Sequence, residues 1–234
     1  MTDAGRRAHV LERLAFHQVA QDHVGRSLCS TAVDVVQVPG AALMLVDDAG
    51  TVHPVGVHGE VMEAVEDLQQ VHGEGPCIDA HHLGAPVGEP DLARPSTPRW
   101  VGFTPLAVEA GARAMFGYPL RIGSTCIGAL NLCAERTGPL SGDQHRDALL
   151  LADVAVTTLL AAGPDGAPDR LTRSLVDDDT GQLVVHQATG MVAVQVGTDV
   201  GDALARLRAH AFVTGRRLSA VAQDVVARRL RLEP

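Results

Sequence analysis

The sequence predicts an α+β fold in two parts: an antiparallel sheet flanked by helices over residues 6–162, and a small three-helix bundle over residues 182–234. Short β-like runs occur as two hairpin-like pairs in the first part, whereas the second part has only helical periodicity. Between them, residues 163–169 contain two prolines and two glycines. We therefore expect residues 163–181 to be a linker between two domains.

Helices and hairpins are predicted to alternate in the first part. Residues 6–36 carry Val10, Leu14 and Val19 at helical spacing and form one predicted helix, which Pro39-Gly40 ends. A hairpin of strands 41–46 and 51–57 follows, with Gly50 in its turn, and then a helix at 60–71 with Val61, Ala64, Val65 and Leu68 on one face. A short helix at 78–82 comes after a glycine-rich break, and residues 86–92 form an extended segment. Pro95 and Pro98 introduce a helix that ends near Gly111, a second hairpin has strands 114–122 and 126–134, and a last helix starts at 141–144 and ends near 162.

Three short helices are predicted in the second part. The first covers residues 182–196, the second is capped by Thr198-Asp199 and ended by Gly215, and the third is capped by Ser219. Each has a single apolar face, so the three are expected to pack on one another.

Charge divides the two parts. Residues 182–234 carry seven arginines and four acids, a net charge of +3, while the preceding residues carry twelve arginines and twenty-four acids, a net charge of −12. Such an asymmetry favours a polyanion as the partner of the basic part, although solvated arginines on helix surfaces are the simpler explanation.

The composition argues against several classes of site. The four cysteines, Cys29, Cys77, Cys126 and Cys133, form no CxxC pair, and no His-Glu-x-x-His occurs, so no metal site is expected. Adjacent His81 and His82 point apart, which disfavours haem ligation. We expect no cofactor, no membrane span, no signal peptide and a cytoplasmic location.

The first part resembles a GAF domain. The residues that carry this resemblance are 41–46, 73–80 (GEGPCIDA), 116–123 (FGYPLRIG) and 127–132 (IGALNL). It implies a sensor domain with a small-molecule ligand, but the cyclic-nucleotide fingerprint of the family needs a lysine and this chain has none.

Cys77 and Asp79 are the candidate residues for ligand binding or redox sensing. Cys77 lies at a predicted helix start, where the helix dipole would lower the pKa of its thiol. A buried, unreactive cysteine is the alternative that we favour. The neighbouring carboxylates Glu63, Glu66 and Asp67 have the spacing of a solvated helix face.

The second part resembles an ANTAR domain, a three-helix RNA-binding module of bacterial transcription antiterminators. Residues 184–191 (VVHQATGM), 203–211 (ALARLRAHA) and 217–222 (RLSAVA) carry this resemblance. It implies binding to RNA hairpins in nascent leader transcripts and control of transcription termination.

Arginines of the second and third predicted helices are the candidate RNA-binding residues. Arg216 and Arg217 are best placed for phosphate, together with one of Arg206 and Arg208, which lie on different sides of their helix. The predicted interface also includes three residues of the first helix. Ala188 and Gly190 are small and permit close approach, and Thr189 stands where many ANTAR sequences have a lysine.

We therefore expect a signal-responsive regulator rather than an enzyme. The helices at 6–36 and 141–162 are expected to pair two copies into a homodimer, and the signal would shift how the two basic tails are presented. Two alternatives remain: a thiol enzyme of the free methionine sulfoxide reductase type that uses Cys77 with Cys126 or Cys133, and a helical scaffold that binds proteins.

Overall fold

The computed structural model describes residues 2–21, 23–47, 52–95, 98–162 and 182–232. Its helices and strands follow the predicted order with few exceptions. In chain order they are α1 (Asp3–Ala20), α2 (Val24–Val36), β1 (Gly40–Val46), β2 (Val52–His58), α3 (Glu60–His72), α4 (Pro76–Leu83), β3 (Val87–Glu89), α5 (Thr104–Glu109), β4 (Ala114–Ile122), β5 (Thr125–Ala134), α6 (Gly142–Ala162), α8 (Gln182–Val196), α9 (Val200–Thr214) and α10 (Leu218–Val226).

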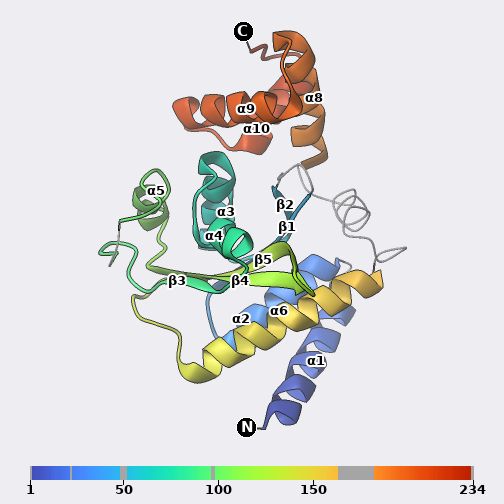
Figure 1. The fold of residues 1–234 in the computed structure, drawn as a ribbon, viewed down its shortest axis with the longest axis vertical. Coiled ribbons are helices and arrows are strands. Elements are labelled where there is room, and N and C mark those ends of the chain that lie inside the picture. Colours follow the sequence, from blue (N-terminus) through green and yellow to red (C-terminus); the bar gives the residue numbers. More distant parts are fainter. Residues whose placement is uncertain (1, 22, 48–51, 96–97, 163–181, 233–234) are drawn as a thin grey trace.

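Five strands form one antiparallel sheet in the order β2-β1-β5-β4-β3 (Figure 1). Both predicted hairpins, β1–β2 and β4–β5, are confirmed, and β1 joins them by pairing with β5. The extended segment at 86–92 contributes the short edge strand β3.

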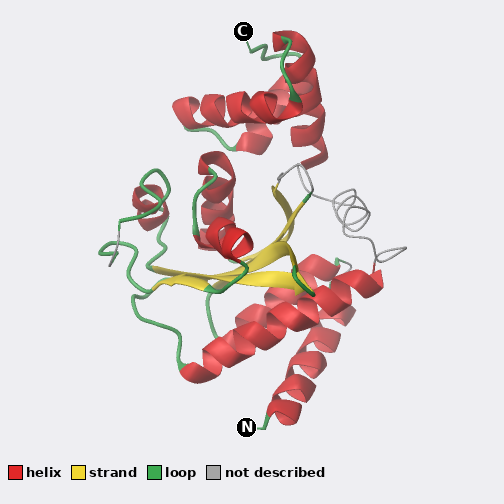
Figure 2. Cartoon of the chain, viewed as in Figure 1, coloured by secondary structure: helices red, strands yellow, loops and turns green. Residues whose placement is uncertain are grey.

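Helices cover both faces of the sheet (Figure 2). The α1, α2 and α6 helices lie on one face, and α3 and α4 lie on the other. Neighbouring side chains of β5 point to opposite faces, so Leu130 and Leu132 join the core under α2 and α6, while Ala129 and Cys133 join the core under α3 and α4. Each face therefore has its own apolar core.

The single helix predicted over residues 6–36 is wrong, because the chain breaks it into α1 and α2. Gln21 ends α1 in extended conformation, and Val19, predicted on the apolar face, is 91% exposed. The break lets α2 lie against β2, where a Cβ on Gly25 would stand 2.0 Å from the carbonyl oxygen of Val55. Only glycine permits this approach, and no proline or glycine at the break marks it in the sequence.

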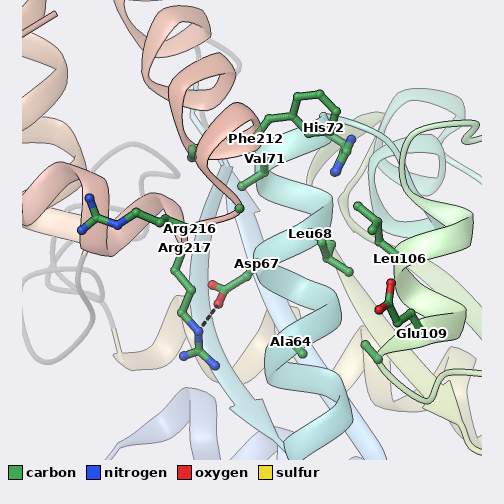
Figure 3. A pocket seen from close by; sticks show the side chains of 13 residues that line it. Ala64, Asp67, Leu68, Val71, His72, Leu106, Glu109, Phe212, Arg216 and Arg217 are labelled. Carbon is green, nitrogen blue, oxygen red and sulfur yellow. Dashed lines mark ion pairs between the residues drawn. The ribbon is translucent and has the colours of Figure 1, made fainter.

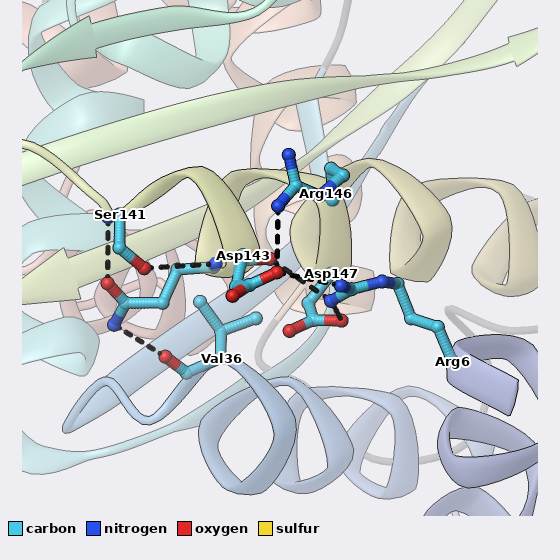
Figure 4. Close-up of polar contacts among 7 residues, drawn as sticks. Arg6, Val36, Ser141, Asp143, Arg146 and Asp147 are labelled. Atoms are coloured by element: carbon cyan, nitrogen blue, oxygen red, sulfur yellow. Dashed lines mark hydrogen bonds and ion pairs between the residues drawn. The ribbon is translucent and has the colours of Figure 1, made fainter. Parts of the chain in front are cut away.

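The start of α6 ties three helices together (Figure 4). Ser141 and Gln144 exchange the two hydrogen bonds of a capping box, at 3.2 and 2.9 Å. Nε2 of Gln144 also donates to the carbonyl of Val36 at the end of α2, at 2.8 Å. Buried Arg6 of α1 pairs with Asp147 and with Asp143 on α6. Polar contacts thus fix α1 and α2 to the predicted helix start.

The starts of two predicted helices need correction, and two further predictions concern residues that the structure does not describe. The helix introduced by Pro95 and Pro98 begins only at Thr104. The third C-terminal helix begins at Leu218, so its cap is Arg217 rather than Ser219. The Gly50 turn and the linker at 163–181 lie outside the described residues.

The C-terminal helices α8, α9 and α10 form a separate unit with its own apolar core. As predicted, Asp199 caps α9 by accepting from the Asp202 amide at 2.9 Å, and Gly215 ends it in left-handed conformation. The fully buried residues of this core are Ala188, Val192, Ala203, Leu207, Val221, Ala222 and Val225. The three-helix bundle predicted from the apolar faces is therefore present.

Candidate functional site

A buried polar cluster lies between α3 and the sheet. Glu66 is 4% exposed, and its Oε2 accepts hydrogen bonds from Nδ2 of Asn131 on β5 at 3.1 Å and from Nε2 of Gln69 at 3.2 Å. Within the described residues, Oε1 of Glu66 and Oδ1 of Asn131 have no hydrogen-bond partner. Two buried acceptors are therefore left without a donor among the described residues.

Burial gives Glu66 an unusual acidity. It raises the pKa of the carboxyl from 4.5 to about 7, although the hydrogen bonds from Asn131 and Gln69 favour the anion. The prediction that Glu66 belongs to a solvated helix face is thus wrong, because α3 turns this position toward the sheet. A proton on Glu66 would supply the donor that the cluster lacks.

One sequence signal for this cluster was available. Met62, Val65, Glu66 and Gln69 are the buried residues of α3 and follow the spacing i, i+3, i+4, i+7. Two of the four are polar, so the apolar periodicity of the helix indicates the neighbouring face of Val61, Ala64, Val65 and Leu68 instead. A carboxylate and an amide at buried helix spacing were the informative pattern.

Cys77 lies beside this cluster, and both Cys77 and Asp79 have structural contacts. Cys77 is fully buried, and burial, together with the Glu66 charge, raises the pKa of its thiol, the opposite of what the helix start predicts. Its backbone amide donates to Oε1 of Gln69 at 3.3 Å. Asp79 accepts a hydrogen bond from Nε1 of Trp100 at 2.9 Å. The favoured interpretation of a buried cysteine agrees with this geometry.

A second candidate site is a pocket of about 400 Å³ where α3 and α5 meet α9 and the turn into α10 (Figure 3). The wall is largely apolar, with contributions from both parts of the chain. The main apolar residues are Ala64, Leu68, Val71, Leu106, Ala211 and Phe212. The predicted apolar face of helix 60–71 thus divides, with Val65 facing the sheet and Ala64 and Leu68 facing this pocket.

Three contacts dock the C-terminal bundle on α3. Nε of Arg217 pairs with Oδ2 of Asp67 at 3.0 Å. The ring of Phe212 stands edge-on to His72, with 5.1 Å between ring centroids. Val71 packs against the core of the bundle. The outer side of α3 is therefore a junction between the two parts of the chain.

The candidate RNA-binding arginines occupy different surroundings. Arg206, Arg216 and Arg217 are exposed, whereas Arg208 is half-buried, and burial lowers the pKa of its guanidinium. Arg216 pairs with Asp224 at 2.6 Å. Sequence reasoning missed Arg229, which pairs with the same carboxylate at 2.7 Å, because the spacing along the chain does not reveal a shared partner.

The first-helix candidates are only partly accessible. Ala188 and Thr189 are buried in the bundle, and the Thr189 hydroxyl donates to the carbonyl of Val185 at 2.7 Å. Gly190 is exposed, and a Cβ placed on it would meet nothing within 4 Å. Their role in RNA binding stays a prediction, and in this arrangement only Gly190 is open to a ligand.

Over the described ranges, no three His, Cys, Asp or Glu side chains come together as a metal site. None of the described helices has the length and apolar character needed to span a membrane.

The family comparison matches the GAF domain to residues 22–162. The match includes the whole sheet and ends with α6, so the C-terminal bundle lies beyond it. No curated protein matches this chain.

Solved structures share the fold of the matched region. The GAF domain of a phosphoenolpyruvate-protein phosphotransferase from Acinetobacter is 12% identical, with 69% of this chain and 96% of that chain covered and a TM-score of 0.51. The corresponding domain from Coxiella burnetii is 14% identical with the same coverage and TM-score. A free methionine-R-sulfoxide reductase from Neisseria meningitidis, solved with its substrate, is 18% identical over 75% of this chain and 96% of that chain, with a TM-score of 0.46. At 12% and 14% identity, the two phosphotransferase GAF domains show a shared fold and nothing more.

Proposed function

The chain belongs to the GAF domain family, and we propose that it is a signal-responsive regulator whose GAF domain controls an RNA-binding C-terminal bundle. The observation that carries this proposal is the second unit itself. It has an apolar core of its own, and its surface is rich in arginine although the rest of the chain is acidic. Its exposed arginines are Arg206, Arg216, Arg217, Arg228, Arg229 and Arg231.

A cluster of Arg216, Asp224 and Arg229, here called the Asp224 cluster, supports phosphate binding. One carboxylate holds two guanidinium groups, which keep the pKa of Asp224 below its usual value. The cluster has a surplus positive charge, and the arginine side chains are still 43% and 65% exposed. Guanidinium groups fixed in this way can bind phosphate oxygens and stack on unpaired bases.

RNA hairpins in nascent leader transcripts are the proposed targets, and control of termination is the proposed outcome. Unpaired loop bases and the phosphate backbone of a hairpin offer the features that arginines recognise. We place this activity in the cytoplasm, where transcripts are made. The resemblance of residues 184–191 and 203–211 to ANTAR domains supports the same assignment.

A homodimer is part of the proposal. Four large apolar side chains of α1 and α6 remain exposed: Leu11, Phe16, Val19 and Leu149. Pairing of these helices would cover that apolar surface. A signal received by the GAF domain would then shift the relative populations of two arrangements of the basic bundles.

The state of the thiols favours a regulator over a thiol enzyme. Cys77 and Cys133 are buried, and burial raises the pKa of both thiols, that of Cys133 to about 12. A thiol with such a pKa has almost no nucleophilic thiolate near neutrality. Cys126 is half-buried, and burial raises the pKa of its thiol as well.

Recovery of RNA bound to the full chain in cells tests the function. We expect transcripts with paired hairpins upstream of terminators, and binding of one such labelled hairpin that weakens steeply as salt rises. A DNA duplex of the same sequence is the control. Equal affinity for both nucleic acids, or no recovered hairpins, would refute the proposal.

Replacement of Gly190 by alanine separates stability from RNA contact. Alanine should stabilise the bundle by about 1 kcal/mol, because a glycine inside a helix costs that much and no neighbour obstructs the added methyl group. If RNA approaches this position closely, the same variant will bind the hairpin more weakly while unfolding at higher urea concentration. Gly201→Ala, in the first turn of α9, is the control for affinity.

A further inference from the structure

We propose that the pocket between α3, α5 and α9 binds a small hydrophobic molecule that carries a positive charge. The site lies on the outer side of α3, away from the buried cluster around Glu66 and from the sheet. This inference goes beyond the proposed function, because ligand binding at the junction can be measured without any RNA.

The size and lining of the pocket suit a small organic molecule. Its volume of about 400 Å³ lies within the range of ligand sites, and it lies between two structural units, where such sites are common. In Figure 3, Leu68 of α3 and Leu106 of α5 point toward each other, and Phe212 lies at the upper end of the pocket. An aromatic or branched aliphatic group would replace water against these side chains.

The charged side chains around the pocket favour a ligand with a positive charge. Asp67 pairs with Arg217. Arg216 shares Asp224 with Arg229, so the surplus positive charge of the Asp224 cluster is divided between two arginines, and Arg229 lies outside the lining of the pocket. Glu109 lines the pocket from α5 and pairs with no cation among the residues that the structure describes. The exposed side chain of Glu109 is therefore a carboxylate at the pocket that can accept a positive partner, and an ammonium group supplies both the charge and the hydrogen-bond donors.

His72 provides a second polar group without a partner. Its Nε2 is buried and makes no hydrogen bond within the described part of the chain. Burial lowers the pKa of the ring, which favours the neutral imidazole and reduces the repulsion of a cationic ligand. An unpartnered buried nitrogen in the wall of a pocket is expected where a ligand completes the hydrogen bonding.

Binding here would act on both units at once. Leu68 and Glu109 belong to the GAF domain, whereas Ala211 and Phe212 belong to the bundle. A ligand that contacts both sides binds the docked arrangement better than a separated one, and so increases its population. The pocket thus gives small molecules a direct way to hold the basic bundle against α3.

Three probes with one apolar body and different charges test the proposal on the full chain. They are 2-phenylethylamine, 2-phenylethanol and 3-phenylpropanoate, and their dissociation constants are measured by NMR titration of the backbone amides. We expect amide shifts at Leu68, Leu106 and Phe212, and the amine to bind about fivefold more tightly than the alcohol, as one exposed charge pair permits. The carboxylate should bind most weakly.

Two variants locate the site. Glu109→Gln should make the amine and the alcohol bind equally well, while Glu12→Gln on exposed α1 should change nothing. Ala64→Leu should fill the pocket and weaken the binding of all three probes about tenfold or more. Ala161→Leu, at an exposed position of α6, is its control. The proposal is overturned if no probe binds the native chain, if the carboxylate binds as well as the amine, or if either pocket variant binds like its control.

Discussion

Arg216→Ala/Arg229→Ala is expected to bind its RNA hairpin about 100-fold more weakly than the native chain. Each guanidinium can make a charge-assisted contact with phosphate that contributes about 1.5 kcal/mol, roughly tenfold in affinity. The slope of log affinity against log salt should fall by about 2, since two fewer counterions are released. Fluorescence anisotropy titrations at several salt concentrations measure both quantities.

Two further variants make this prediction decisive. Removing both arginines leaves Asp224 without the partners that it has in the native chain, so a triple variant that also carries Asp224→Ala separates lost attraction from added repulsion. It should bind about as weakly as the double variant. Arg94→Ala/Arg136→Ala removes two exposed arginines of the GAF domain and should bind normally. Equal loss of affinity in this control would mean that only net charge matters.

Glu66→Gln is expected to stabilise the chain at about pH 8 by roughly 3 kcal/mol and to have little effect at about pH 5. The folded-state pKa of Glu66 is raised from 4.5 to about 7, so the folded state binds this proton more tightly than the unfolded state. The resulting stability is fully present below pH 4.5 and is lost as the pH rises through about 7. Glutamine never ionises, and its amide can donate to the unpaired Oδ1 of Asn131.

Urea unfolding at a series of pH values between these limits measures the effect. The native chain should lose stability between about pH 5 and about pH 8. The loss for Glu66→Gln should be smaller by roughly 3 kcal/mol. Glu63→Gln, three residues earlier on the same helix, is exposed and is the matched control. Parallel curves of stability against pH for the native chain and Glu66→Gln would show that folding does not raise the pKa of Glu66, and would contradict the prediction.

The fold was largely predictable because its hairpins and helix ends depend on local chemistry. Ser141 and Asp199 make the cap contacts that their positions predict, and Gly215 has the left-handed conformation expected after a helix. The break at Gln21 was missed for the opposite reason. It follows from the packing of Gly25 on Val55, a contact between residues thirty positions apart that no local pattern records.

The candidate sites were less predictable because they depend on pairs distant in the sequence. Asn131 on β5 binds Glu66 on α3, and Arg217 after α9 binds Asp67. A single sequence shows each of these residues but not its partner. The sequence shows which residues carry a charge. Tertiary packing decides whether each charged side chain is buried, and burial in turn decides its pKa.

Helix α3 packs on two sides, since its Glu66 side faces the sheet and its Asp67 side faces the bundle. Among its thirteen residues only Glu60 and Glu63 are exposed. A helix at the edge of a domain normally tolerates substitutions over half of its surface, but α3 has almost no such positions. It should therefore diverge as slowly as a core strand among descendants of this chain, and changes on its outer side should be accompanied by changes in the bundle.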